Sequence, residues 1–222
     1  MRLRLGLLLW VVQVLYLAVE LIAVAAVQAP YSLVDNTISD LGAVGCATVA
    51  YPTGPVPVCS PGHVAVNVSF VVFGAAMALG AVLLRPFLFT GRAGWVTTAV
   101  WVVAGVAQVG SGLVPVDADL EGHALVSAPG IVATGLASVL MGWRAGTLRR
   151  WPRWRAVVLV VGAGSLVCGA FFVVRLDTSW GGLLERAALW PSCVLLTLVA
   201  HLLGAASAQE ARSVRGRTSP AH

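Results

Sequence analysis

The sequence predicts an all-α, polytopic membrane protein: a six-transmembrane-helix bundle with a short outer-loop helix after helix one. Two observations predict this fold. Hydrophobic residues make up 59% of the 222 residues and charged residues only 10%, far below the roughly 25% charged residues of soluble domains; the mean hydropathy is +0.90. The apolar residues also fall into six separate runs, each close to the ~20 residues that a helix needs to cross a bilayer.

The six predicted spans are residues 5–27, 63–84, 94–114, 123–143, 156–174 and 184–205. Because they leave little chain for a soluble domain, we expect residues 1–208 to form one membrane domain and residues 209–222 a polar cytoplasmic tail. A cleaved signal peptide is the alternative for the first run. Its apolar stretch exceeds the usual length of about 7 to 15 residues and contains Glu20, and Pro30 would follow the cut.

The arginines define the two sides of the membrane. All 14 basic residues are arginines, and with the N-terminus inside only Arg175 and Arg186 fall outside. Seven of the nine acids, by contrast, fall outside. Cytoplasmic loops carry the excess of basic residues, so both termini are predicted to be cytoplasmic. The juxtamembrane arginines suit lipid head groups, and no nucleic-acid-binding motif accompanies them.

Two of the four cysteines, Cys46 and Cys59, share the first outer loop with a proline-rich segment. An oxidising compartment permits a disulfide between them, which is our prediction; two free thiols are the alternative. Cys168 and Cys193 lie inside predicted helices and are interpreted as small packing residues.

The first outer loop, residues 28–62, is much longer than the other connections, and loops of that length are usually functional or disordered. We expect Asp35 to cap a short helix over residues 36–43. Ile38 and Leu41 would form its apolar side, lying on the membrane surface or tucked between helix ends. This polar segment is therefore a candidate lid.

Glu20 lies about seven residues before the outer end of the first span, hence roughly 10 Å inside the hydrocarbon. A carboxylate at that depth needs a partner in the bundle interior. The candidates are Arg175, Arg186, His63 and Asn67. A role confined to helix packing is the alternative.

The two outer arginines can pair with neighbouring acids or with a more distant group. Asp177 and Glu185 stand beside Arg175 and Arg186 in the sequence, which favours local ion pairs because the partners are already at hand. The other interpretation is that they hold Glu20 or an anionic ligand.

Two histidines begin helices on the outer side and could bind a metal. His63 and His123, with Asp117 or another outer acid, would supply zinc ligands and leave a position for a water nucleophile. No His-Glu-x-x-His motif supports this, and histidines that cap or hydrogen-bond are the alternative. We expect no cofactor, with zinc as the alternative. Ser39, Ser60 or Ser127 as a nucleophile is disfavoured because no Gly-x-Ser-x-Gly motif occurs.

Three short elements resemble a known family. They are Ser-Asp-Leu-Gly at residues 39–42, Ser-Pro-x-His-x-x-x-Asn at residues 60–67, and Pro-x-Asp with a later His at residues 115–123. The chain resembles the bacterial membrane family named domain of unknown function 998 over nearly its whole length. The resemblance implies six membrane helices in a bacterial plasma membrane and no established activity.

Together these features predict that residues 31–45 fold over a polar pocket at the outer mouth of the bundle. The candidate pocket residues are Glu20, Asp35, Asn36, Ser39, Asp40, His63, Asn67, Asp117, His123 and Arg175. We expect a protein that binds a small polar or lipid-derived ligand, or a membrane partner, rather than an enzyme. A metal-dependent intramembrane hydrolase using His63 and His123 is the alternative, and a small transporter the third interpretation. The sequence does not predict an oligomeric state.

Overall fold

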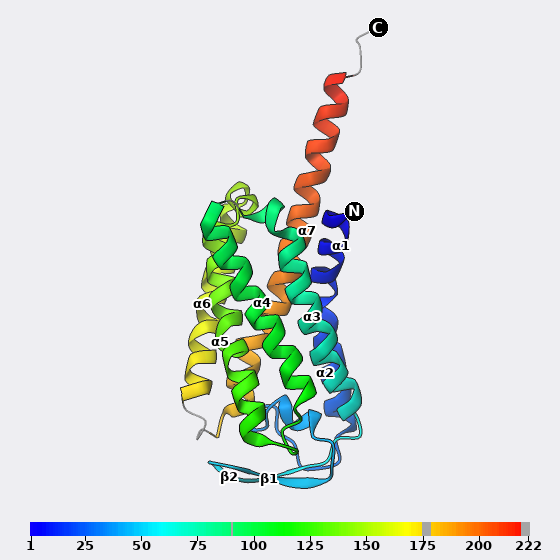
Figure 1. Ribbon diagram of the computed structural model, residues 1–222, viewed down its shortest axis with the longest axis vertical. Helices are drawn as coiled ribbons and strands as arrows, with labels where there is room; N and C mark the ends of the chain where they lie inside the picture. Colours follow the sequence, from blue (N-terminus) through cyan, green and yellow to red (C-terminus); the bar gives the residue numbers. More distant parts are fainter. Residues whose placement is uncertain (90, 175–178, 219–222) are drawn as a thin grey trace.

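The structure is a computed structural model that describes residues 1–89, 91–174 and 179–218, and helices dominate it (Figure 1). In chain order its elements are α1 (Arg2–Val11), η1 (Val12–Val14), α2 (Leu15–Ala26), η2 (Ser39–Gly42), β1 (Ala47–Tyr51), β2 (Gly54–Val58), α3 (His63–Leu88), α4 (Gly91–Leu113), α5 (Leu120–Arg144), η3 (Thr147–Arg150), α6 (Pro152–Val174) and α7 (Gly181–Thr218).

Six helices in the described ranges are long and apolar enough to cross a membrane, which confirms the predicted fold class. The first of these, Arg2–Ala26, combines α1, η1 and α2. Each predicted span overlaps one of these helices, and most helices begin and end within a few residues of the predicted bounds. The exception is α7, which continues to Thr218 and so includes most of the predicted tail.

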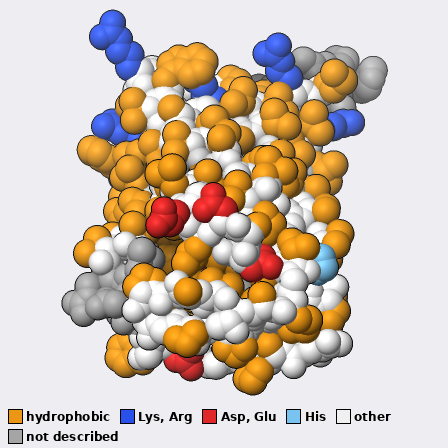
Figure 2. All heavy atoms as spheres, turned by 60° about the horizontal axis from the view of Figure 1, so that its bottom comes forward, with side chains coloured by type: hydrophobic (Ala, Val, Ile, Leu, Met, Phe, Trp, Pro, Cys, Tyr) orange, Lys and Arg blue, Asp and Glu red, His pale blue; other side chains and the backbone are white. Residues whose placement is uncertain are grey.

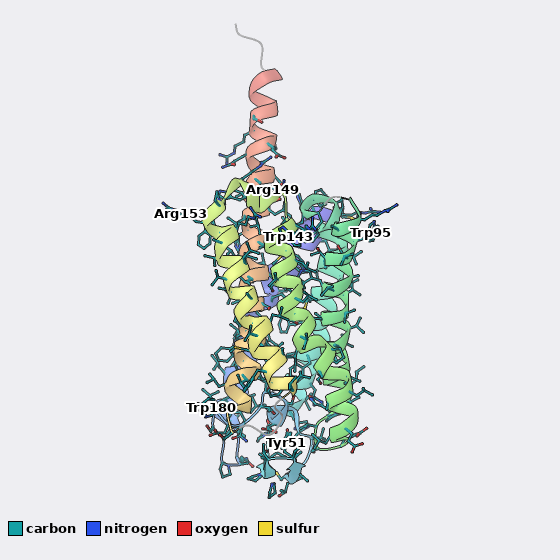
Figure 3. The ribbon with its side chains drawn as sticks, turned by 90° about the vertical axis from the view of Figure 1, so that its left-hand side faces the viewer. Tyr51, Trp95, Trp143, Arg149, Arg153 and Trp180 are labelled. Atoms are coloured by element: carbon teal, nitrogen blue, oxygen red, sulfur yellow. A yellow bond between two sulfur atoms is a disulfide. The ribbon has the colours of Figure 1, made fainter. Side chains whose placement is uncertain are left out.

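Helices that follow one another in the chain pack against each other, and α7 also contacts α1 and α5. The N-terminus and the C-terminal end of α7 lie at the same end of the bundle (Figure 1). Arg149 and Arg153 mark this arginine-rich end, whereas Tyr51 and Trp180 mark the opposite end, which carries the two strands (Figure 3). We call the latter the hairpin end.

Close backbone contacts hold the bundle together. A Cβ on Gly74 of α3 would lie 2.6 Å from the carbonyl oxygen of Gly105 on α4, so only glycine permits this approach. Near the middle of the first span the helix tightens into η1. There Thr197 Oγ1 of α7 lies 3.2 and 3.1 Å from the carbonyl oxygens of Trp10 and Val11, so that its single proton can serve either helix carbonyl away from water.

The sequence did not predict the β-hairpin within the long loop. Strands β1 and β2 pair antiparallel, from Ala47 opposite Val58 to Tyr51 opposite Gly54. Gly54 has φ +129°, a conformation that L side chains rarely adopt, which suits it to the turn. The predicted disulfide between Cys46 and Cys59 is present and closes the open end of the hairpin.

The predicted loop helix over residues 36–43 is wrong in length: only Ser39–Gly42 is helical, as a single 3-10 turn. Asp35 is exposed and does not cap it. Thr37 and Asp40 instead bond reciprocally: Asp40 accepts from the Thr37 amide at 2.8 Å and Thr37 Oγ1 accepts from the Asp40 amide at 3.2 Å, a capping-box arrangement that starts the turn after Thr37 rather than after Asp35. Ile38 and Leu41 are completely buried, which confirms the alternative that they tuck between helix ends.

Candidate functional site

Residues 31–45, which we call the plug segment, cover the hairpin end of the bundle. Their main-chain groups meet side chains from two helices, α3 and α7, and from the α4–α5 connection, rather than packing only against one another. Acidic side chains are visible on this face, whereas the arginines visible among the described residues lie at the far margin (Figure 2). The site is best described by these anchors, beginning with the deepest.

Arg186 of α7 is the central anchor. Its Nε donates to Oε1 of Glu20 at 2.9 Å, and its Nη1 donates to the carbonyl oxygens of Leu33 and Asn36 at 2.9 and 2.8 Å. Its Nη2 donates to the Tyr31 hydroxyl. Trp190 completes the coordination of Glu20 by donating to Oε2 at 2.7 Å. One guanidinium therefore neutralises a membrane carboxylate and fixes the start of the plug segment.

The prediction that the outer arginines pair locally is wrong for Arg186. Glu185 accepts instead from the Ile38 amide, at 2.6 Å. Consecutive residues on a helix point about 100° apart and do not face each other, so Glu185 and Arg186 reach different parts of the loop. Arg175 and Asp177 lie outside the described residues.

Two further anchors come from residues of the family-like motifs. Asn67 of α3 donates to the Gly42 carbonyl at 2.8 Å, and a Cβ on Gly42 would lie only 2.5 Å from Asn67 Oδ1. Asp117, in the α4–α5 connection, accepts from the amides of Val44 and Gly45 at 2.9 and 2.8 Å. The close approach explains a glycine at position 42, and Asp117 fixes the end of the plug segment.

Asp40 joins the plug segment to the hairpin. Its Oδ1 accepts a 2.7 Å hydrogen bond from the Tyr51 hydroxyl, and Asn36 donates to its Oδ2 at 3.3 Å. Burial, followed by the charge of Asp40, raises the pKa of Tyr51 well above its ordinary value. Burial likewise raises the pKa of Tyr31, which faces Arg186. Both phenols therefore stay protonated and can donate.

Ser39 and His123 form the remaining polar contact of the plug segment. Ser39 Oγ lies 2.8 Å from His123 Nε2, and His123 Nδ1 lies 2.6 Å from the Val114 carbonyl oxygen. Both side chains are buried. Because a carbonyl only accepts, the proton of neutral His123 sits on Nδ1, and Ser39 donates to Nε2.

A cavity of about 380 Å³ lies beneath the hairpin, between the plug segment and α5, α6 and α7. Its apolar lining includes Val56, Val116, Leu120, Ile131, Phe172 and Val173. Its polar lining includes Ser39, Asp40, Tyr51, His123, Ser127 and Glu185. The volume is within the ~300–1,000 Å³ range of small-molecule sites, which combine apolar walls with a few polar groups.

A second, smaller cavity of about 30 Å³ lies deeper in the bundle. Ser39, Ser127, Ile131 and Glu185 line both cavities, so the two are adjacent. Gln108, Ser111 and Thr134 add polar groups to the deeper one. It has room for water, which needs roughly 10–15 Å³ and two or more polar partners.

The predicted pocket residues separate into two groups. Ser39, Asp40, His123 and Asp35 line the larger cavity, whereas Glu20, Asn36, Asn67 and Asp117 act as the anchors described above. His63 is not in the cavity lining; its Nδ1 lies 2.8 Å from the Ser60 carbonyl oxygen. Within the described residues, no three His, Cys, Asp or Glu side chains gather as metal ligands. Among the described residues, therefore, no cluster of side chains supports the zinc alternative.

Sequence reasoning missed Tyr31, Tyr51, Glu185 and Trp190 as parts of the site. Glu185 carried a usable signal, since an acid followed directly by a base on one helix cannot make a face-to-face pair. Tyr31 and Trp190 gave no such signal, because their partners lie 155 and 170 residues away in the chain. Tyr51 gave none because its contact with Asp40 depends on the hairpin, which the sequence did not predict.

Comparison with known proteins identifies a family for most of the chain. Neither the comparison with curated proteins nor that with solved structures gives a match. The family model described as "Protein of unknown function (DUF998)" matches residues 10–202, from the first span into α7. The matched range includes the plug segment, its anchors and both cavities, and the chain therefore belongs to this family of membrane proteins.

Proposed function

We propose that the larger cavity binds a small lipid-derived amphiphile, with an apolar chain and a head group that bears hydroxyl or ammonium donors. The observation that carries this proposal is the placement of Glu185. This carboxylate is only 4% exposed and lines both cavities, and within the described residues its one hydrogen bond is that of Oε2 with Ile38. A donor on a ligand would complete its hydrogen bonding.

The apolar walls support the same ligand class. Leu120, Ile131 and Phe172 offer a surface for a hydrocarbon chain, and burying such a chain contributes about 0.8 kcal/mol per methylene group. Arg186 does not recruit an anionic head group in this arrangement, because Glu20 and main-chain carbonyls already occupy it. The net acidic lining favours a neutral or cationic head group.

Binding is tested with the purified protein in lipid nanodiscs and the ether 1-O-decylglycerol, which cannot be hydrolysed. We expect saturable binding to the wild type. Ala128→Phe, which fills the cavity, should weaken it at least tenfold. Leu125→Phe is the matched control on the same helix, since Leu125 is 77% exposed and absent from the cavity lining. Equal affinity in the wild type and Ala128→Phe would contradict the proposal.

We also propose that the hairpin end faces the outside of a bacterial plasma membrane and that both termini are cytoplasmic. The arginine-rich end supports this orientation because cytoplasmic ends carry the basic excess, and the disulfide supports it because such bonds persist in oxidising compartments. In intact cells a membrane-impermeant maleimide should label Glu121→Cys and spare Ser213→Cys. The reverse labelling would invert the topology.

A further inference from the structure

The geometry around Ser39 is that of an activated nucleophile. Its Oγ lies 2.8 Å from His123 Nε2, to which it donates when the imidazole is neutral, and the Val114 carbonyl holds the imidazole through Nδ1 at 2.6 Å. A serine becomes nucleophilic when a base accepts its proton and a third group orients that base. Here the three groups stand in that order.

The surroundings hold this pair in place. Ser39 begins the η2 turn, and the residues on either side of it are fixed by Glu185, which binds the Ile38 amide, and by Tyr51, which binds Asp40. His123 lies in the first turn of α5, which Asp119 caps by accepting from the Gly122 amide at 2.9 Å. A rigid frame keeps nucleophile and base within reach of each other.

No other described serine has this arrangement. Ser127, in the same cavity, shares a hydrogen bond with the Ser111 hydroxyl at 2.8 Å. Ser60 meets His63 only through its main-chain carbonyl. The absence of a Gly-x-Ser-x-Gly motif does not count against Ser39, because such dyads and triads are recognised by geometry and roles rather than by sequence position.

We propose that Ser39 and His123 are the nucleophile and general base of an esterase that cleaves a fatty-acyl ester of a small alcohol in the larger cavity. This inference rests on the proposed ligand binding. The acyl chain lies along the apolar wall near Ile131, the ester carbonyl meets Ser39 Oγ, and the hydroxyls of the alcohol donate to Glu185.

The reaction proceeds in two balanced steps. Ser39 Oγ attacks the ester carbonyl carbon while its proton passes to His123 Nε2; the bond from carbon to the alkoxy oxygen then breaks, and the alcohol leaves with that proton. In the second step water attacks the acyl-serine, giving one proton to His123, which returns it to Ser39 Oγ as the fatty acid departs. The deeper cavity, which Ser39 also lines, offers a place for this water.

Covalent labelling tests the dyad directly. The reconstituted protein is treated with a fluorophosphonate bearing a decyl chain, and its intact mass is measured. We expect one adduct in the wild type, located at Ser39 by peptide mapping, and none in Ser39→Ala. His123→Gln should slow labelling by about 10²- to 10⁴-fold, the usual contribution of a general base. Ser60→Ala, at a serine outside the lining of both cavities, should label as the wild type does.

Hydrolysis of 1-decanoylglycerol provides the second readout and separates the two proposals. Binding of 1-O-decylglycerol by the wild type, with hydrolysis and labelling by the wild type and by Ser60→Ala but not by Ser39→Ala, supports the dyad. Ether binding without any labelling or hydrolysis by the wild type overturns the dyad and leaves the binding function standing. No ether binding overturns the binding function, and labelling of Ser39→Ala at the wild-type rate overturns the role of Ser39. Unchanged thermal unfolding of Ser39→Ala shows that the variant is folded.

Discussion

Arg186 and Glu20 are 166 residues apart in the chain, yet their side chains meet at 2.9 Å in the interior of the bundle. The pair joins the last spanning helix to the first, and both side chains are almost fully buried. Its other hydrogen bonds lead to Trp190 and to the plug segment. The ion pair therefore links the helix bundle to the loop that covers it.

Removing one member of this pair is expected to be strongly destabilising. Arg186→Gln leaves the Glu20 carboxylate buried without its cation, and Glu20→Gln does the same to the guanidinium; either change should lower the free energy of unfolding by about 3–5 kcal/mol. The double variant should lose less than the sum of the two. Unfolding by SDS in mixed micelles measures all four proteins as a double-mutant cycle. Strictly additive losses would show that the two groups do not interact.

Gly42→Ala should destabilise the plug segment through a clash. The new methyl group would lie 2.5 Å from Asn67 Oδ1, and relieving such overpacking costs about 1–3 kcal/mol. Gly45→Ala is the matched control, because its nearest atom would be Asp117 Oδ2 at an ordinary 3.5 Å. Thermal unfolding should separate the two variants, and Asn67→Ala should restore part of the loss in Gly42→Ala. A similar loss in both glycine variants would argue against the contact.

Asp117→Asn should loosen the end of the plug segment, because an amide offers one acceptor oxygen for the two main-chain donors at Val44 and Gly45. Hydrogen exchange at these two amides should speed up by at least about tenfold, which corresponds to roughly 1.4 kcal/mol of opening free energy. Glu121→Gln makes a control on the same face. Unaltered exchange in Asp117→Asn would contradict the assigned anchor.

Tyr51 should make the protein sensitive to alkali. Its raised pKa means that above about pH 10 the unfolded chain loses the phenolic proton while the folded protein keeps it. The free energy of unfolding contributed by this group is thus complete below pH 10 and falls as the pH rises above that value, by up to about 1.4 kcal/mol per pH unit. Tyr51→Phe cannot titrate, so its stability should fall less steeply. Parallel curves for both proteins would contradict the assignment.

Which parts of this structure the sequence could predict depends on whether the signal was local. Apolar runs and arginine placement are local patterns, so the six spans and the shared end of the termini followed from them. The hairpin escaped prediction because its prolines suggested only a stiff turn, whereas Pro55 and Pro57 lie at alternate positions of β2, an arrangement that a short edge strand tolerates.

The contacts within the site could not be predicted, because they join residues that only the folded bundle brings together. The depth of Glu20 indicated that it needs a cation, but the sequence offered Arg175 and Arg186 alike, and it did not show that Arg186 of α7 reaches Glu20 on the first span. Ser39 and His123 were each identified as polar candidates. Their hydrogen bond was not predictable, because it joins positions 84 residues apart through a turn whose shape depends on anchors from other helices.

The positions of these anchors along the chain also determine when, during synthesis, the plug segment can be fixed in place. The plug segment is synthesised soon after the first span, but Glu185 and Arg186 are synthesised only with α7, the last of the spans described. Until α7 inserts, Glu20 lacks its guanidinium partner and the Ile38 amide lacks the Glu185 acceptor, so a chain truncated before α7 leaves a carboxylate in the membrane without a cation, which is costly.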